Sequence, residues 1–200
     1  MKKRVVVFLA LMTSSCLYAD ELSDMRKEIE SLKKEVAELR SHGQSGTAQN
    51  TPLAVDRKAG IRKKYEEDKK TYSEEQLREI ETLYQVANKQ WRTPEAKESL
   101  KKLIEMYPKS NRTGCAVQYM GQMSSGEEKE KYLRLAIQDF GDCYYGNGVQ
   151  VGAYARFCLA YYYKEIGKEK EAKTFFDEIR KDYPDAVNHK GRLLIDSIPK

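Results

Sequence analysis

The sequence predicts an all-α fold: a short N-terminal coiled coil, a flexible linker, and a three-repeat solenoid of helical hairpins closed by a C-terminal capping helix. Three observations lead to this prediction. Downstream of residue 73, apolar residues recur every three or four positions, which is the period of an amphipathic helix. Residues 153–184 suit two short helices that turn at Gly167 and end at Pro184. Residues 20–40 carry a heptad repeat.

Residues 1–19 have the pattern of a secretory signal peptide. Basic residues occupy positions 2–4, and an apolar run at positions 5–12 follows that is too short to span a bilayer. We expect cleavage after Ala19 and export of the mature chain. The alternative is cleavage before Cys16, which would leave a lipoprotein anchored to the membrane through that residue.

Residues 20–40 form the predicted coiled coil. Branched residues and Leu occupy the first core position of each heptad, and Met and Leu occupy the second. Glu precedes the first core position and Arg or Lys follows the second, so that in a parallel assembly each Glu faces a basic residue of the neighbouring helix. This composition favours a parallel dimer and leaves a trimer open. The alternative is an amphipathic helix that packs on its own domain. The residues predicted to mediate oligomerisation are Leu22, Met25, Ile29, Leu32, Val36 and Leu39.

Residues 41–56 form the predicted linker, because Gly, Ser, Gln, Asn and Thr dominate its sequence and no apolar period survives. The repeat domain is expected to span residues 57–200. Its first stretch, residues 57–72, is so charged that we expect a marginal helix or a solvated extension of the array. Ile61 and Tyr65 lie one turn apart and are expected to form a thin contact stripe.

Three helical hairpins are predicted next, at residues 73–108, 111–141 and 153–184. The first begins with a capping box, Ser-Glu-Glu-Gln, in which side chains satisfy free amides at the helix start. An insertion at residues 142–152 contains three glycines, which permit tight backbone turns. Residues 188–198 are expected to form a terminal helix that covers the end of the stack.

The third hairpin resembles a tetratricopeptide repeat. The positions that this repeat favours are occupied by Leu159, Ala160, Tyr163, Gly167, Ala172, Phe176 and Pro184.

Together with the leader, the coil and the linker, the repeats resemble the organisation of the Tol–Pal-associated cell-division coordinator family of the Gram-negative periplasm. The closing segments 103–108 and 179–184 are similar to the repeat ends of that family. The resemblance implies a periplasmic adaptor that self-associates through its N-terminal part and holds a protein partner with its repeats.

A peptide-binding groove is predicted on the face formed by the first helix of each hairpin. Aromatic rings there would cover apolar side chains of an extended peptide, amides would pair with its backbone, and a lysine would pair with a carboxylate. The alternative is that half of these tyrosines are ordinary packing residues. The predicted partner-binding residues are Gln118, Gln122, Tyr144, Tyr145, Tyr154, Phe157, Tyr161 and Lys164.

The sequence contains no recognisable catalytic, cofactor or metal motif. Cys115 and Cys158 fall at matching positions of adjacent first helices and are expected to be buried, whereas Cys143 lies in the insertion and could form a disulfide with either. No C-x-x-C pair is present, and the two histidines, His42 and His189, are far apart in the sequence. We therefore expect no metal, no cofactor and no enzymatic activity.

The net charge of +5 comes largely from the three basic residues of the leader, so no basic face for nucleic acid is expected. The sequence as a whole predicts an exported scaffold or adaptor in envelope or cell-division organisation. The alternative is a peptidoglycan-binding module or an accessory of cell-wall enzymes, which would use the Tyr-rich insertion on glycan. A third interpretation, an enzyme that uses Cys143, has no candidate reaction.

Overall fold

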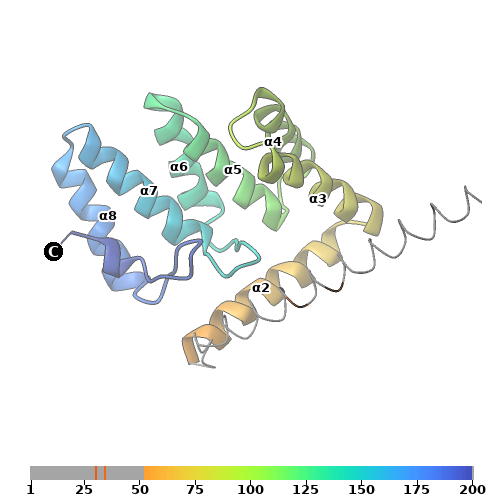
Figure 1. The fold of residues 1–200 in the computed structure, drawn as a ribbon, viewed down its shortest axis with the longest axis horizontal. Coiled ribbons are helices and arrows are strands. Elements are labelled where there is room, and N and C mark those ends of the chain that lie inside the picture. Colours follow the sequence, from red (N-terminus) through yellow and green to blue (C-terminus); the bar gives the residue numbers. More distant parts are fainter. Residues whose placement is uncertain (1–29, 31–33, 35–51, 200) are drawn as a thin grey trace, which may run out of the picture. The chain divides into compact units, whose positions relative to one another are not determined.

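The computed structural model describes Glu30, Lys34 and residues 52–199 of the 200-residue chain. The predicted signal peptide, the six core positions of the predicted coiled coil and residues 41–51 of the predicted linker lie outside the described residues. The described elements are α2 (Pro52–Thr71), α3 (Glu74–Lys89), α4 (Pro94–Met106), α5 (Asn111–Met123), α6 (Gly126–Asp139), α7 (Val151–Glu165), α8 (Glu169–Asp182) and the 3₁₀ turn η1 (Ile195–Ser197) (Figure 1).

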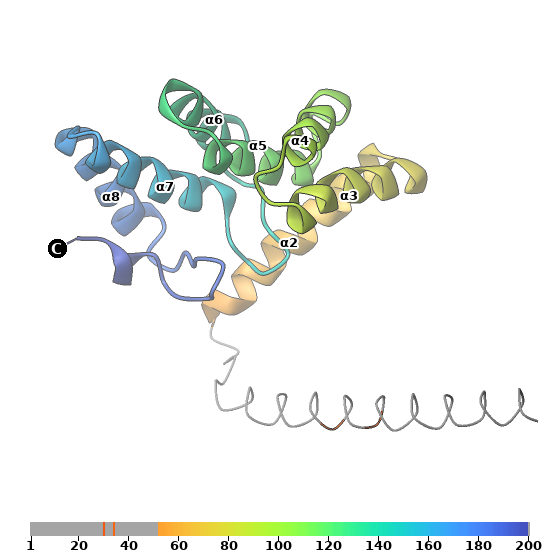
Figure 2. The same cartoon turned by 45° about the horizontal axis from the view of Figure 1, so that its top comes forward.

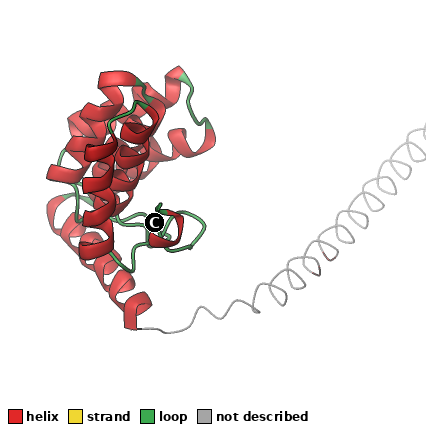
Figure 3. Ribbon diagram, turned by 90° about the vertical axis from the view of Figure 1, so that its left-hand side faces the viewer, coloured by secondary structure: helices red, strands yellow, loops and turns green. Residues whose placement is uncertain are grey.

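Helices α3 to α8 form a solenoid of three helical hairpins, which confirms the predicted fold class. The members of each pair pack together, α3 with α4, α5 with α6 and α7 with α8, and α4 packs on α5 as α6 packs on α7. The first helices also touch one another, since α3 contacts α5 and α5 contacts α7. We call the side of the array formed by α3, α5 and α7 the inner face. Over the described residues the structure is built from helices and loops, without a β-strand (Figure 3).

Local sequence accounts for where α3, α4 and α5 begin. The capping box is confirmed: Ser73 Oγ accepts from the amide of Gln76, and Gln76 Oε1 accepts from the amide of Ser73 at 2.9 Å. Thr93 caps α4, with Pro94 in its first turn, and Ser110 caps α5. Each cap stabilises a helix start by about 1 kcal/mol, so the boundaries follow from short-range chemistry.

The core runs through all three hairpins. Its centre is formed by fully buried leucines and alanines, and each leucine contributes about 1.5–3 kcal/mol through removal of its side chain from water. Helices α5 and α6 approach closely at Gly121, where an added Cβ atom would lie 2.7 Å from Leu133 Cδ2. The buried aliphatic and alanine side chains include Leu100, Leu103, Leu133, Leu159, Ile179, Ala96, Ala116, Ala136, Ala160 and Ala172.

The insertion after α6 forms a tight turn closed by an isolated antiparallel bridge between Tyr144 and Gln150, and we call residues 142–150 the first loop. The amide of Tyr145 donates to the carbonyl of Val149, and the amide of Gly148 donates to that of Tyr145. Gly148 has a φ of 90°, a left-handed conformation that favours glycine.

The same loop recurs after α8, where residues 185–193 form what we call the second loop. An antiparallel bridge joins Val187 to Leu193, and Gly191 has a φ of 74°. Four backbone hydrogen bonds of the first loop have counterparts here, between residues whose numbers are higher by 43. The insertion is therefore part of a structural unit that occurs twice.

The predicted terminal helix at residues 188–198 is wrong. That range contains the tip of the second loop and the single 3₁₀ turn η1. The side chain of Asn188 accepts from the amides of Lys190 and Arg192, which holds the backbone in a turn and competes with a helix. Leu194 and Ile198 are buried, so the apolar pattern in this segment reflects burial of a non-helical chain end that covers α7 and α8.

Helix α2 begins at Pro52, inside the range expected to be linker, and lies along the two loops and the start of α5 (Figure 2). Several of its contacts are polar. Arg57 Nη1 donates to the carbonyl of Asp185 at 2.8 Å, Lys64 Nζ lies 2.5 Å from Asp142 Oδ2, and Asp68 accepts from the amide of Asn111. The expected apolar stripe is not made, because the Tyr65 side chain stays 58 % exposed.

Candidate functional site

A continuous series of aromatic side chains crosses the inner face from the first hairpin to the third, and we call it the aromatic row. Its members come from the turn after α3, from α5 and α7, and from the two loops. Neighbouring ring centroids lie between 4.7 and 6.1 Å apart, the range of favourable aromatic pairs. In order of contact the row consists of Trp91, Tyr119, Tyr145, His189, Tyr154, Phe157 and Tyr161.

The α3 end of the row carries an exposed ring. Trp91 is 41 % exposed and meets the ring of Tyr119 edge to face, with centroids 5.0 Å apart. Tyr119 also stacks on the buried ring of Tyr84 at 5.5 Å, and its hydroxyl donates to Asn88 Oδ1 at 3.1 Å. This end therefore combines a broad apolar surface with an exposed amide, the two features that hold an extended peptide.

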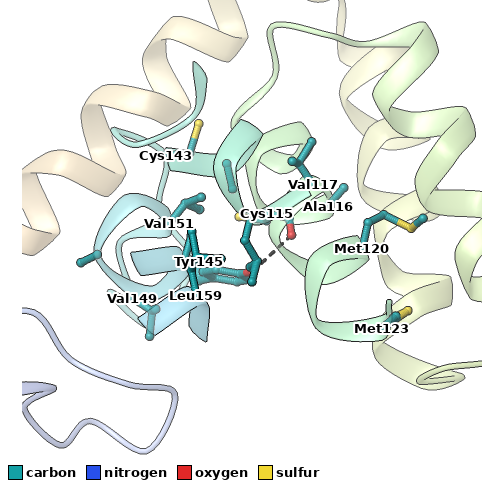
Figure 4. Packing of buried hydrophobic residues seen from close by; sticks show 14 of the residues in the cluster. Cys115, Ala116, Val117, Met120, Met123, Cys143, Tyr145, Val149, Val151 and Leu159 are labelled. Carbon is teal, nitrogen blue, oxygen red and sulfur yellow. Dashed lines mark hydrogen bonds between the residues drawn. The ribbon is translucent and has the colours of Figure 1, made fainter. Parts of the chain in front are cut away.

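The middle of the inner face is filled by the first loop. Tyr145 is buried, and its hydroxyl donates to the carbonyl of Cys115 at 3.2 Å and lies against Gln118 Oε1 (Figure 4). Gln118 is fully buried, and its side chain also meets Gln122 and Cys158. The structure brings Gln118, Gln122 and Tyr145 together, and Gln118 and Tyr145 seat the loop on α5.

The second loop and the C-terminal segment cover α7 in a similar way. His189 meets the rings of Tyr145 and Tyr154 edge to face at 4.7 and 4.8 Å, and Asn147 Nδ2 lies 3.3 Å from His189 Nδ1. The hydroxyl of Tyr161 donates to the carbonyl of Ser197. Tyr154 and Tyr161 are therefore partly occupied by this chain's own residues.

The other predicted binding residues lie apart from this arrangement or at its edge. Phe157 is half-buried between Tyr154 and Tyr161 in the row. Tyr144 packs its ring on α2 outside the row. Lys164 is exposed at the far end of α7, on the rim of a hollow beside α8.

Sequence reasoning missed Trp91, Tyr119 and His189. Trp91 stands where a repeat of this kind has its turn glycine. That unusual residue at a turn is the signal by which Trp91 could have been found. Tyr119 matches the helical period of the core and gave no separate signal. His189 joins the row only because the second loop folds back on the first, a contact across 42 residues that no local pattern encodes.

The cysteines do not form a reactive centre. Cys115, Cys143 and Cys158 are free thiols, and Cys115 is fully buried as expected, while Cys158 is only partly so. Burial raises the pKa of Cys143 to about 12, which suppresses the thiolate that a nucleophile needs. Among residues 52–199 no group of three or more His, Cys, Asp or Glu side chains could hold a metal ion. None of the helices in that range is both long and apolar enough to cross a membrane.

A stack of helical hairpins with an aromatic inner face is the architecture of a protein interaction scaffold, and such folds are typically non-enzymatic. Residues 154–186 match the family model described as tetratricopeptide repeat. The match covers the hairpin of α7 and α8 and supports a tetratricopeptide repeat protein that binds a protein partner. Neither the search of curated proteins nor that of solved structures gave a match.

Proposed function

We propose that the chain is an exported, non-enzymatic adaptor that self-associates through residues 20–40 and binds a segment of a protein partner on the inner face. The contact is centred on the α3 end of the aromatic row, at Trp91, Tyr119, Asn88 and Gln122. The observation behind this proposal is the exposure of Trp91 on a supported ring. An exposed tryptophan backed by packed aromatics is the side chain that most often dominates binding energy at protein interfaces.

The two loops reduce the part of the inner face that a partner can contact. Because the first loop seats Tyr145 on α5 and the second places His189 on Tyr154, the surface left for a partner runs along the C-terminal ends of α3 and α5. Polar groups on this stretch, Asn88 and Gln122, suit the backbone of an extended segment. The partner is therefore expected to present apolar or proline-rich residues in an extended conformation.

Trp91 is the single tryptophan of the chain, so its fluorescence reports on this site directly. We expect a purified partner, first isolated by crosslinking in cells, to shift the emission of Trp91 on titration. Trp91→Ala should weaken binding by at least tenfold, while Met106→Ala, which removes an apolar side chain of similar exposure on α4, should leave it unchanged. Equal losses for both variants, or none for Trp91→Ala, would exclude the aromatic row as the contact.

Self-association is proposed from the heptad pattern, and it is tested separately. Sedimentation equilibrium of the mature chain with and without residues 20–40 should show a dimer or trimer in the first case and a monomer in the second. Equal masses would contradict it.

The proposed role in the cell envelope rests on the leader-like N-terminus and on the resemblance to the Tol–Pal-associated coordinator family. This role would place the chain in the periplasm or, if Cys16 is lipidated, on the membrane. An adaptor should remain in solution when mixed with purified peptidoglycan. Co-sedimentation with peptidoglycan would favour the alternative, a wall-binding or cell-wall-enzyme accessory module.

A further inference from the structure

A cleft of about 300 Å³ lies between α2, α3, the start of α5 and the first loop, and we call it the α2 cleft. Two of its apolar side chains, Ile61 and Leu77, are only half-buried, and the ring of Tyr65 beside them is 58 % exposed. Apolar surface in this cleft therefore remains accessible within the described part of the chain. The lining includes Ile61, Tyr65, Asp68, Leu77, Glu81 and Arg112.

The charges that line the cleft leave the carboxylate of Asp68 without a cation at ion-pair distance among residues 52–199. Glu81 and Arg112 neutralise each other, with Arg112 Nε 2.8 Å from Glu81 Oε2. Asp68 accepts from a neutral donor, the amide of Asn111, at 3.0 and 3.2 Å from its two oxygens. Lys64, one turn away on α2, is held by two other carboxylates. Burial raises the pKa of Asp68 above its usual range, so a cation bound in the cleft would offset the loss of water around this charge.

A line of contacts connects the α2 cleft to the surface proposed for the partner. Trp91 meets Tyr119, which stacks on Tyr84. The guanidinium of Arg112 lies 4.4 Å from the ring centroid of Tyr84, and Arg112 lines the cleft. The cleft therefore extends the proposed surface along α3 and α5, toward the N-terminal ends of both helices.

The spacing between the cleft and the exposed tryptophan follows from these two helices. Glu81 of α3 contacts Arg112 of α5. Seven residues further along each helix, Asn88 contacts Tyr119. The helices therefore run in the same direction, and seven residues span about 10.5 Å. An extended chain covers that distance in about three residues.

We propose that the α2 cleft takes a basic side chain, lysine or arginine, from the partner segment that contacts Trp91, about three residues away from the apolar residue or proline on that ring. The inference rests on the proposed function and adds a charge requirement to it. The cationic group lies at the carboxylate of Asp68, and the aliphatic stem packs on Leu77 and Tyr65, as the stems of long basic side chains do on apolar surface.

The first test needs no partner. N-acetyl-lysine methylamide is titrated at constant ionic strength into the ¹⁵N-labelled full mature chain, and the norleucine analogue serves as the uncharged control. The amide of Asn111, which donates to Asp68, reports on the carboxylate directly. The lysine compound should shift this amide in a saturable way, and the norleucine compound should not. No shift with lysine, or equal shifts with both compounds, would overturn the proposal.

Substitutions assign the shift to the carboxylate. Asp68→Asn keeps an oxygen that accepts from the amide of Asn111 but removes the charge, and should abolish the response to lysine. Glu66→Gln, at an exposed acid of α2 outside the lining, should leave it unchanged. Hydrogen exchange along α2 should be the same in both variants, which shows that the helix stays docked. A response to lysine that survives Asp68→Asn would contradict the assignment.

The second test separates this inference from the proposed function. With the purified partner, Asp68→Asn should weaken binding about tenfold, a typical value for a hydrogen bond between charged groups, and Glu66→Gln should not. Replacing the basic residue of the partner by Gln should have the same effect and add nothing to Asp68→Asn. Loss of binding with Trp91→Ala but not with Asp68→Asn would overturn this inference and leave the aromatic contact standing. Loss with Asp68→Asn alone would exclude the aromatic contact and keep the cleft.

Discussion

The ring of Tyr144 in the first loop lies directly against Gly60 in the middle of α2. A Cβ atom built on Gly60 would lie 2.8 Å from Cε2 and Cζ of that ring, closer than side chains approach in proteins. The main chain of Tyr144 cannot easily yield, because its amide and carbonyl both pair with the side chain of Asn111 at 2.8 Å. A glycine that weakens the helix by about 1 kcal/mol is therefore what allows α2 to dock.

Gly60→Ala should loosen α2 from the array even though alanine is the better helix former. We expect faster hydrogen exchange along α2 and little change in the core helices. In the background of Tyr144→Ala the obstacle is gone, and the same substitution should become neutral or stabilising by up to about 1 kcal/mol. Faster exchange in both backgrounds would show that the ring is not the cause.

Lys64→Met should also release α2, because the lysine makes its ion pair with Asp142 while its own side chain is only 16 % exposed. Burial opposes the charge, but the hydrogen bonds that Lys64 donates to Asp142 and Glu67 outweigh it and raise the pKa of Lys64. We expect a loss of about 1 kcal/mol in the local stability of α2, measured by hydrogen exchange. Lys63→Met is the matched control, since that neighbouring side chain is 74 % exposed and its contact with Glu67 is long, at 3.8 Å; an equal effect there would contradict the prediction.

Acidification should loosen the contact between the two loops. Burial lowers the pKa of His189 below 6.5, so the unfolded chain binds this proton more strongly than the folded one. The stabilisation is complete above pH 6.5 and is lost as the pH falls through the lowered pKa. His189→Phe keeps a ring against Tyr145 and Tyr154 without a titrating group, and should flatten the pH dependence of thermal stability between pH 7 and 5. His42→Gln should leave that pH dependence unchanged. A flattened dependence in His42→Gln and an unchanged one in His189→Phe would assign the effect to His42.

Native Cys143 should resist alkylation. Its pKa of about 12 leaves almost no thiolate at pH 8, and the side chain is buried. Treatment with iodoacetamide at that pH should label it only after unfolding in urea, as measured by mass spectrometry of its peptide. Fast labelling of the folded chain would revive the interpretation that Cys143 has a chemical role.

Individual residues show how much of the arrangement around the predicted site follows from the sequence, while partner binding there stays a prediction. Tyr154, Phe157 and Tyr161 share one side of α7 because helical spacing puts them there, and that spacing is visible in the sequence. Gln118 occupies an equivalent place on α5 but is fully buried, because a tyrosine 27 residues further along covers it. Trp91 supplies the exposed ring instead, at a turn where the backbone of Arg92 has a φ of 66°.

The starts of α3, α4 and α5 and their caps were determined by the sequence itself, because they depend on contacts within a few residues along the chain. Ser73 finds Gln76 three residues away wherever the rest of the protein lies. The burial of the inner face and the conformation of residues 188–198 were decided by tertiary structure. Two loops far apart in sequence fold onto the same surface, and the water-accessible area of an aromatic ring depends on what other segments place over it.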